Sequence, residues 1–190
     1  MDEEALRAQV YGLLAVLLAA PPSPRTLAVL AQLDGGDTAL GQAFAELGKA
    51  ARTTDADTAE DEYFRLFVGV AGGELTPYAS WYRTGFLHEK PLAVLRADLA
   101  RLGIERDPAC PEPEDHVASL METMQGLISG AFGQPLPLPG QKAFFDAHIA
   151  GWAGDFFRDL EGAGAASLYR PLGSLGRIFL GVEAEAFAMV

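Results

Sequence analysis

The spacing of apolar residues along the chain predicts a series of helices. Near the N-terminus, four apolar residues recur at intervals of three or four: Leu6, Val10, Leu13 and Leu17. This spacing places them on one face of a helix. The most regular pattern extends over residues 144–160, where apolar and aromatic residues repeat in steps of four without a break. We therefore predict one amphipathic helix across that segment.

Helix start signals divide the N-terminal third further. Ser23 followed by Pro24 is typical of a cap and first turn, and the helix it begins is expected to end near residues 35–36, a Gly-Gly pair. Asp37 is the expected cap of a third helix. A fourth helix is expected over residues 54–68, because acidic residues are concentrated in its N-terminal half, where they complement the helix dipole.

The remainder of the chain continues the helical pattern, with helices expected over 92–102 and 114–132 and a last helix with Pro171 in its first turn. Residues 69–90 contain Gly-Gly, Pro and clustered aromatics, which indicates an ordered loop. Together these segments predict a compact all-α bundle of about eight or nine helices.

A proline-rich hinge is expected at residues 107–113, where three prolines fall within seven residues. We expect a single domain over residues 1–190, with an N-terminal part (1–106), this hinge, and a C-terminal helical part (114–190).

Composition supports the helical prediction: Ala and Leu total 58 residues, whereas Val, Ile and Thr total 21. The formal net charge is −12, which argues against nucleic acid and anionic membranes as partners. The same charge would attract a cationic peptide, although it could equally serve only solubility.

The apolar run at residues 10–20 superficially resembles the centre of a signal peptide. The residues before it carry net negative charge, whereas a signal peptide requires a positive segment there. The run is also shorter than the roughly 20 residues that span a bilayer. We therefore expect a buried core helix, no stable membrane insertion and a cytoplasmic protein. The single cysteine, Cys110, excludes an intrachain disulfide and a C-x-x-C motif.

Two clusters carry candidate chemistry. Glu112, Asp115 and His116 lie where the hinge enters a helix, and two acids with a histidine could ligate a metal, although a second ligand cluster is missing. A charged helix start that complements the dipole explains the same residues. The second cluster is the aromatic segment 76–82. Such side chains often grip peptides, but they could equally pin a long loop to the core.

Taken in order, the segments resemble the TorD/DmsD-like family of redox-enzyme maturation chaperones. The resemblance rests on residues 62–69 (EYFRLFVG), 77–82 (PYASWY), 112–116 (EPEDH), the helix carrying His148 and Trp152, and the closing segment 168–173. The E-P-x-D-H segment is the most specific of these, and the match spans nearly the whole chain.

The resemblance implies a function and a binding surface. Family members bind the precursor of a molybdenum- or tungsten-cofactor oxidoreductase, commonly through its twin-arginine leader, until the cofactor is inserted, and so prevent premature export. By position, the resemblance assigns peptide binding to eight residues of this chain: Tyr78, Ser80, Trp81, Tyr82, Glu112, Pro113, Asp115 and His116. Asp115 is expected to contact the basic part of the leader, and residues 78–82 its apolar part.

We accordingly expect no enzymatic activity, no catalytic residues, and no cofactor or metal of the protein's own. The alternatives are an adaptor or assembly subunit of a redox complex, or a metal-dependent hydrolase that uses Glu112, Asp115 and His116. The sequence leaves open the client enzyme, nucleotide binding, whether the client's body is bound as well as its leader, and whether the protein is a monomer or a homodimer.

Overall fold

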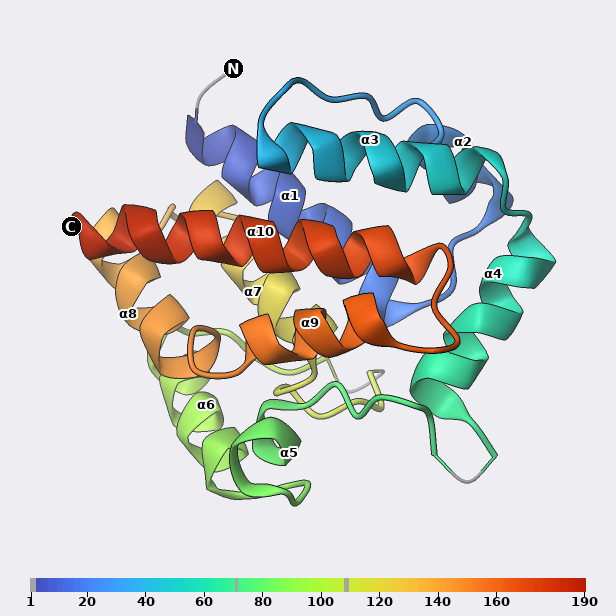
Figure 1. Cartoon of the computed structure of the whole chain (residues 1–190). Coiled ribbons are helices and arrows are strands. Elements are labelled where there is room, and N and C mark those ends of the chain that lie inside the picture. Colours follow the sequence, from blue (N-terminus) through green and yellow to red (C-terminus); the bar gives the residue numbers. More distant parts are fainter. Residues whose placement is uncertain (1–2, 71, 108–109) are drawn as a thin grey trace. The chain divides into compact units, whose positions relative to one another are not determined.

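The computed structural model describes residues 3–70, 72–107 and 110–190. Within these residues it contains ten α-helices and one π-helix (Figure 1). This confirms the predicted all-α fold. The elements are α1 (Glu3–Ala19), α2 (Pro24–Leu30), α3 (Ala39–Arg52), α4 (Ala56–Tyr63), η1 (Phe64–Val68), α5 (Ala79–Thr84), α6 (Lys90–Arg101), α7 (Val117–Ser129), α8 (Leu138–His148), α9 (Ala153–Gly162) and α10 (Tyr169–Ala188).

The chain forms two compact units that do not follow the order of the sequence. Unit 1 contains residues 1–19, 77–153 and 187–190, and unit 2 contains residues 20–76 and 154–186. The expected single domain with parts 1–106 and 114–190 stays a prediction. Of the expected hinge at 107–113, Pro108 and Ala109 lie outside the described residues.

In unit 1, α1 packs along α7 (Figure 1). The buried face of α1 includes Tyr11, Leu14 and Leu18, whereas Leu6 is 46% exposed. Of the predicted face, Leu17 is buried, Val10 and Leu13 are half-buried and only Leu6 is exposed, because this helix is apolar on most sides and its spacing alone does not select one face. The helix thus contributes one buried face to the core, whereas Leu6 and Val16 are exposed. No helix among the described residues is long and apolar enough to cross a membrane.

In unit 2, short polar side chains begin the first three helices. The hydroxyl of Ser23 accepts a hydrogen bond from the Thr26 amide at 3.1 Å, as the sequence predicted. The cap of α3 is Thr38 and not the expected Asp37, and α2 ends at Leu30, before the Gly-Gly pair. Asp55 caps α4, and this contact holds the pKa of its carboxyl below the usual value.

The expected helix over residues 144–160 is interrupted. α8 ends at His148 and α9 begins at Ala153, with Gly151 between them. The indole Nε1 of Trp152 donates to the carbonyl of His148 at 2.8 Å, so a side chain takes the acceptor that a continuing helix would give to a backbone amide. A second difference is α5, which forms inside the segment expected to be a loop.

The EYFRLFVG segment is explained by its packing within unit 2. Glu62 is 1% exposed and accepts hydrogen bonds from the backbone amides of Ser167, Leu168 and Tyr169 at 2.7, 3.1 and 2.8 Å. These amides lead into α10, so Glu62 caps that helix from another element. Phe67 packs edge-on against the Tyr169 ring at 5.5 Å. This motif therefore joins two segments that lie far apart in the sequence.

Candidate functional site

The two sequence segments expected to form the site lie against each other in unit 1. Tyr78 and His116 form an isolated antiparallel β-bridge. On its two sides, the Ala79 amide donates to the Asp115 carbonyl at 3.0 Å, and the Val117 amide donates to the Pro77 carbonyl at 2.8 Å. Backbone pairing thus fixes the start of α5 against the start of α7.

Asp115 connects these segments through its side chain as well. The carboxylate is 1% exposed and accepts a hydrogen bond from the Ser80 amide at 2.9 Å. It also accepts a short hydrogen bond from the Ser80 hydroxyl, which is fully buried. Because Ser80 lies in the first turn of α5, Asp115 supplies the acceptor that this helix lacks at its own N-terminus.

His116 caps α7 and is neutral at ordinary pH. Its Nδ1 accepts a hydrogen bond from the Ala118 amide at 3.2 Å, and its ring lies edge-on to Tyr78, with centroids 5.0 Å apart. Burial lowers the pKa of His116 to about 4, against the smaller opposing effect of Glu112 and Asp115. The imidazole is therefore a hydrogen-bond acceptor that orders the start of the helix.

The remaining predicted residues lie nearer the surface. The Tyr78 hydroxyl donates a short hydrogen bond to Glu112, whose side chain is exposed. Trp81 is 44% exposed, and the half-buried ring of Tyr82 packs against Trp152 at 5.5 Å. The predicted eight residues thus separate into a buried set (Ser80, Asp115 and His116) and an accessible set (Tyr78, Trp81, Tyr82, Glu112 and Pro113).

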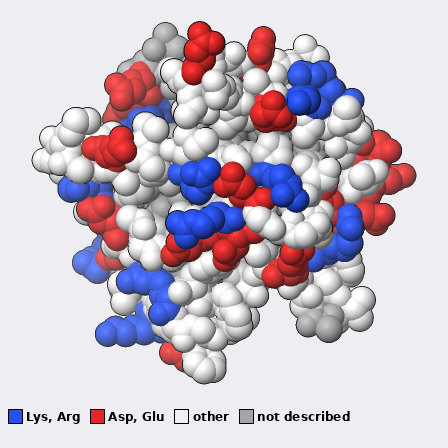
Figure 2. Space-filling model, in the orientation of Figure 1, with Lys and Arg blue, Asp and Glu red and all other residues white. Residues whose placement is uncertain are grey.

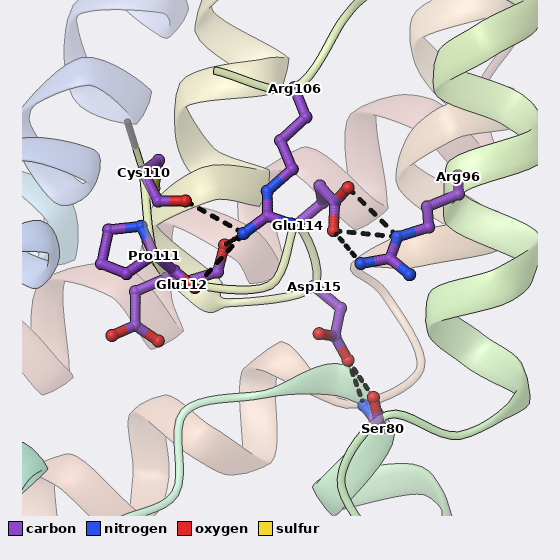
Figure 3. Close-up of polar contacts among 8 residues, drawn as sticks. All are labelled: Ser80, Arg96, Arg106, Cys110, Pro111, Glu112, Glu114 and Asp115. Atoms are coloured by element: carbon purple, nitrogen blue, oxygen red, sulfur yellow. Dashed lines mark hydrogen bonds and ion pairs between the residues drawn. The ribbon is translucent and has the colours of Figure 1, made fainter. Parts of the chain in front are cut away.

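Two arginines of the chain itself bind the E-P-E segment (residues 112–114) and the two residues before it (Figure 3). Arg96 on α6 forms a bidentate pair with Glu114 at 2.8–3.1 Å. Arg106 donates from one terminal nitrogen to the carbonyls of Cys110, Pro111 and Glu112 at 3.0, 3.3 and 3.5 Å. Burial would raise the pKa of Glu114, but the hydrogen bonds and charge of Arg96, with the charge of Arg106, hold it below the usual value.

Neighbouring carboxylates in this segment point in different directions. In Figure 3 the Glu114 side chain extends toward Arg96 and the Asp115 side chain extends toward Ser80. The three residues suggested as metal ligands also have separate partners: Glu112 binds Tyr78, Asp115 binds Ser80, and His116 binds the Ala118 amide. Among the described residues, no group of three His, Cys, Asp or Glu side chains is arranged to hold a metal ion.

An acidic groove in unit 1 adjoins the E-P-E segment. It is lined by Leu99, Ile104, Glu105, Arg106, Asp107, Cys110, Glu112, Glu114, Ser119, Glu122, Thr123 and Phe132. Of these lining residues, five are acidic and one is basic. Sequence reasoning missed Glu105, Asp107, Glu122 and Phe132. They come from three separate segments and have no motif, so only the fold brings them together.

The surface of unit 2 shows a different distribution of charge. Over α9 and α10, basic and acidic side chains alternate (Figure 2). Glu161 pairs with Arg177 at 2.7 Å, and this pairing holds the pKa of Glu161 below its usual value. On this face Asp155 and Glu161 are each paired with an arginine, whereas the groove of unit 1 is lined by five acidic residues and one basic residue.

Comparisons with known proteins identify the class. A family model described as nitrate reductase delta subunit matches residues 33–158, which is more than half of the chain. A crystal structure of a proposed redox enzyme maturation protein from Archaeoglobus fulgidus has a TM-score of 0.61 and 17% identity, with 95% of each chain covered. At that identity the likeness shows the fold alone. No curated protein matches the chain.

The fold and the family match define an all-α protein of the nitrate reductase delta subunit class. The chain belongs to the nitrate reductase delta subunit family, which is TorD-like. The resemblance to the TorD/DmsD-like maturation chaperones is thereby confirmed.

Proposed function

We propose that this protein is a cytoplasmic chaperone for the precursor of a molybdenum- or tungsten-cofactor oxidoreductase. It binds the precursor's twin-arginine leader, supports cofactor insertion and prevents premature export. The observation that carries the proposal is the acidic groove of unit 1, which includes Glu112 and Glu114 and is joined to Tyr78 by the hydrogen bond between Tyr78 and Glu112.

The chemistry of the groove complements a twin-arginine leader. Such a leader has a basic part followed by an apolar part. Glu114 is paired with Arg96, so the negative field for the basic part comes from the other four carboxylates of the groove, partly offset by Arg106. Leu99, Ile104 and Phe132 supply apolar surface within the same groove. Trp81 and Tyr82 on α5 offer further aromatic surface, since Trp81 is exposed and Tyr82 is half-buried. Aromatic side chains bury much area at low entropic cost, which suits them to the apolar part.

The eight site residues divide into two roles in this proposal. Tyr78, Trp81, Tyr82, Glu112 and Pro113 contact the leader, since their side chains are exposed or half-buried. Ser80, Asp115 and His116 position these residues, because their polar atoms already have partners inside the protein. This changes the expectation for Asp115, because its side chain is 1% exposed and is therefore not accessible to the leader.

The test uses fluorescence anisotropy with two synthetic leader peptides. One peptide carries the Arg-Arg pair, and its control carries Lys-Lys at the same positions. We expect the Arg-Arg peptide to bind and its affinity to fall as salt rises, because the groove field is screened. We expect weaker binding of the Lys-Lys peptide, because ammonium groups lack the planar fork of guanidinium. Absence of binding by the Arg-Arg peptide at low salt would overturn the proposal.

A further inference from the structure

The backbone of residues 110–112 is arranged as an acceptor site for a positively charged planar group. The carbonyl oxygens of Cys110, Pro111 and Glu112 converge on one terminal nitrogen of Arg106, at 3.0, 3.3 and 3.5 Å (Figure 3). We call these three carbonyls the carbonyl cradle. It lies in the acidic groove, since Cys110 and Glu112 are among the groove's lining residues.

Arg106 holds this position only weakly. One terminal nitrogen carries two hydrogens, so it cannot form good hydrogen bonds to three acceptors at once, and only the 3.0 Å contact lies well inside the normal range. The Arg106 side chain is also exposed, and hydrogen bonds of exposed groups compete with water. Each carbonyl keeps a second lone pair, so the cradle has unused acceptor capacity.

The neighbouring arginine provides a contrast within the same segment. Arg96 binds Glu114 through two nitrogens in a bidentate geometry, and the Glu114 side chain is only 14% exposed. Bidentate guanidinium–carboxylate pairs are the stronger and more specific kind. Arg96 is therefore the more firmly held of the two arginines.

We infer that the carbonyl cradle of residues 110–112 is a guanidinium-binding subsite that Arg106 fills in the free protein and that an arginine of the leader takes over on binding. The inference rests on the proposed function for the identity of the ligand. Arg106 then acts as an internal competitor, because leader binding requires the fraction of molecules in which the cradle is open.

The first test compares Arg106→Gln with wild type, using the Arg-Arg leader peptide. If Arg106 fills the cradle in about nine molecules of ten, its removal tightens binding about tenfold. The matched control is Arg101→Gln, which removes the same charge from the end of α6, where Arg101 pairs with Asp98. That control is expected to change affinity less than about twofold, since exposed ion pairs contribute little. Equal effects of the two variants, or weaker binding by Arg106→Gln, would overturn the inference.

The second test separates guanidinium recognition from net charge. The increase in affinity caused by Arg106→Gln is expected for the Arg-Arg peptide and not for the Lys-Lys peptide, because an ammonium group does not reproduce the planar fork of guanidinium. The same gain with both peptides would contradict the cradle. Arg106→Lys keeps the charge without the fork, and it should bind the Arg-Arg peptide more tightly than wild type does.

A third probe, arginyl-arginine amide, distinguishes failure of the inference from failure of the proposed function. If the amide binds Arg106→Gln more tightly than wild type while neither protein binds any leader peptide, the result supports the guanidinium-binding subsite and contradicts the proposed function. If Arg106→Gln binds neither the amide nor the Arg-Arg peptide more tightly than wild type does, the guanidinium-binding subsite is contradicted, whether or not wild type binds the leader.

Discussion

At the scale of single residues, the site depends on adjacent side chains with different environments. Glu112 is exposed and accepts a hydrogen bond from the Tyr78 hydroxyl. Asp115 and His116 are buried and accept hydrogen bonds from backbone amides at the starts of α5 and α7. Substitutions within five residues of sequence should therefore separate binding from stability.

A pair of amide substitutions tests this separation. Asp115→Asn should lower the free energy of unfolding by about 1–3 kcal/mol, because the amide oxygen would accept the two Ser80 hydrogen bonds without the negative charge, and its NH2 group would bring donors into a buried position. Glu112→Gln should leave stability within about 0.5 kcal/mol, because Glu112 is exposed, but should weaken leader binding most at low salt. Urea unfolding and peptide titrations at two salt concentrations measure both. Equal stability losses for the two variants would contradict the assigned roles.

His116 should make stability depend on pH. Its pKa in the folded protein is about 4, below its ordinary value of 6.5. Below pH 6.5 the unfolded chain binds a proton that the folded protein excludes, so stability falls as pH falls toward 4. Between pH 7 and pH 5 the expected loss is about 2 kcal/mol. Burial also lowers the pKa of His148, opposed by its hydrogen bond with Asp98, which adds a loss of the same sign.

Urea midpoints of wild type and His116→Asn at pH 7 and pH 5 measure this effect. Asparagine retains capping ability without the titration, so the variant should lose less stability on acidification. The lowered carboxyl pKa values of Asp55, Glu114 and Glu161 act mainly below pH 5 and do not interfere. Identical pH slopes for the two proteins would contradict the assignment.

At the scale of elements, contacts made across the sequence fix helix ends that local signals do not. Glu62 caps α10 from a segment more than 100 positions away, and Asp115 caps α5 across 35. The local cap at Ser23 was predictable, because the Ser23 hydroxyl binds an amide in the first turn of the helix that Pro24 begins. The interruption between α8 and α9 was not, since it depends on the Trp152 indole binding the His148 carbonyl while the apolar spacing continues.

Glu62→Gln tests the remote cap. The amide keeps the shape but loses the charge that faces three backbone donors, so unfolding free energy should fall by about 1–3 kcal/mol. Glu60→Gln, which changes an exposed carboxyl on the same helix, serves as the control and should change stability by less than about 0.5 kcal/mol. If both variants unfold at the same denaturant concentration, Glu62 does not stabilise α10 as described.

The candidate site was only partly predictable. The E-P-E-D-H and aromatic segments could be found because their residue types and order resemble a family. Glu105, Asp107, Glu122 and Phe132 could not, because a groove lined from a loop, a helix and a connector leaves no fixed spacing in the sequence. The roles of Asp115 and Ser80 also required the structure, since burial decides whether a carboxylate is available to a ligand.

At the scale of the whole molecule, the proposed function is the binding of a basic leader by an acidic protein. Both units contribute to the net charge of −12, but acidic and basic side chains alternate over α9 and α10 (Figure 2), whereas five acidic residues and one basic residue line the groove of unit 1. A localised field of this kind attracts a basic leader and guides its encounter. The alternatives of an adaptor subunit and an enzyme do not require such a groove.

The most direct measurement is capture from native cytosol, with wild type as bait and mass spectrometry of the retained proteins. A double variant, Glu105→Gln with Glu122→Gln, serves as the control bait because it reduces the acidic excess of the groove. The account predicts that wild type retains a leader-bearing precursor of a molybdenum- or tungsten-cofactor oxidoreductase and that the control retains much less. Recovery of mature complex subunits alone, or of equal amounts of precursor on both baits, would contradict it.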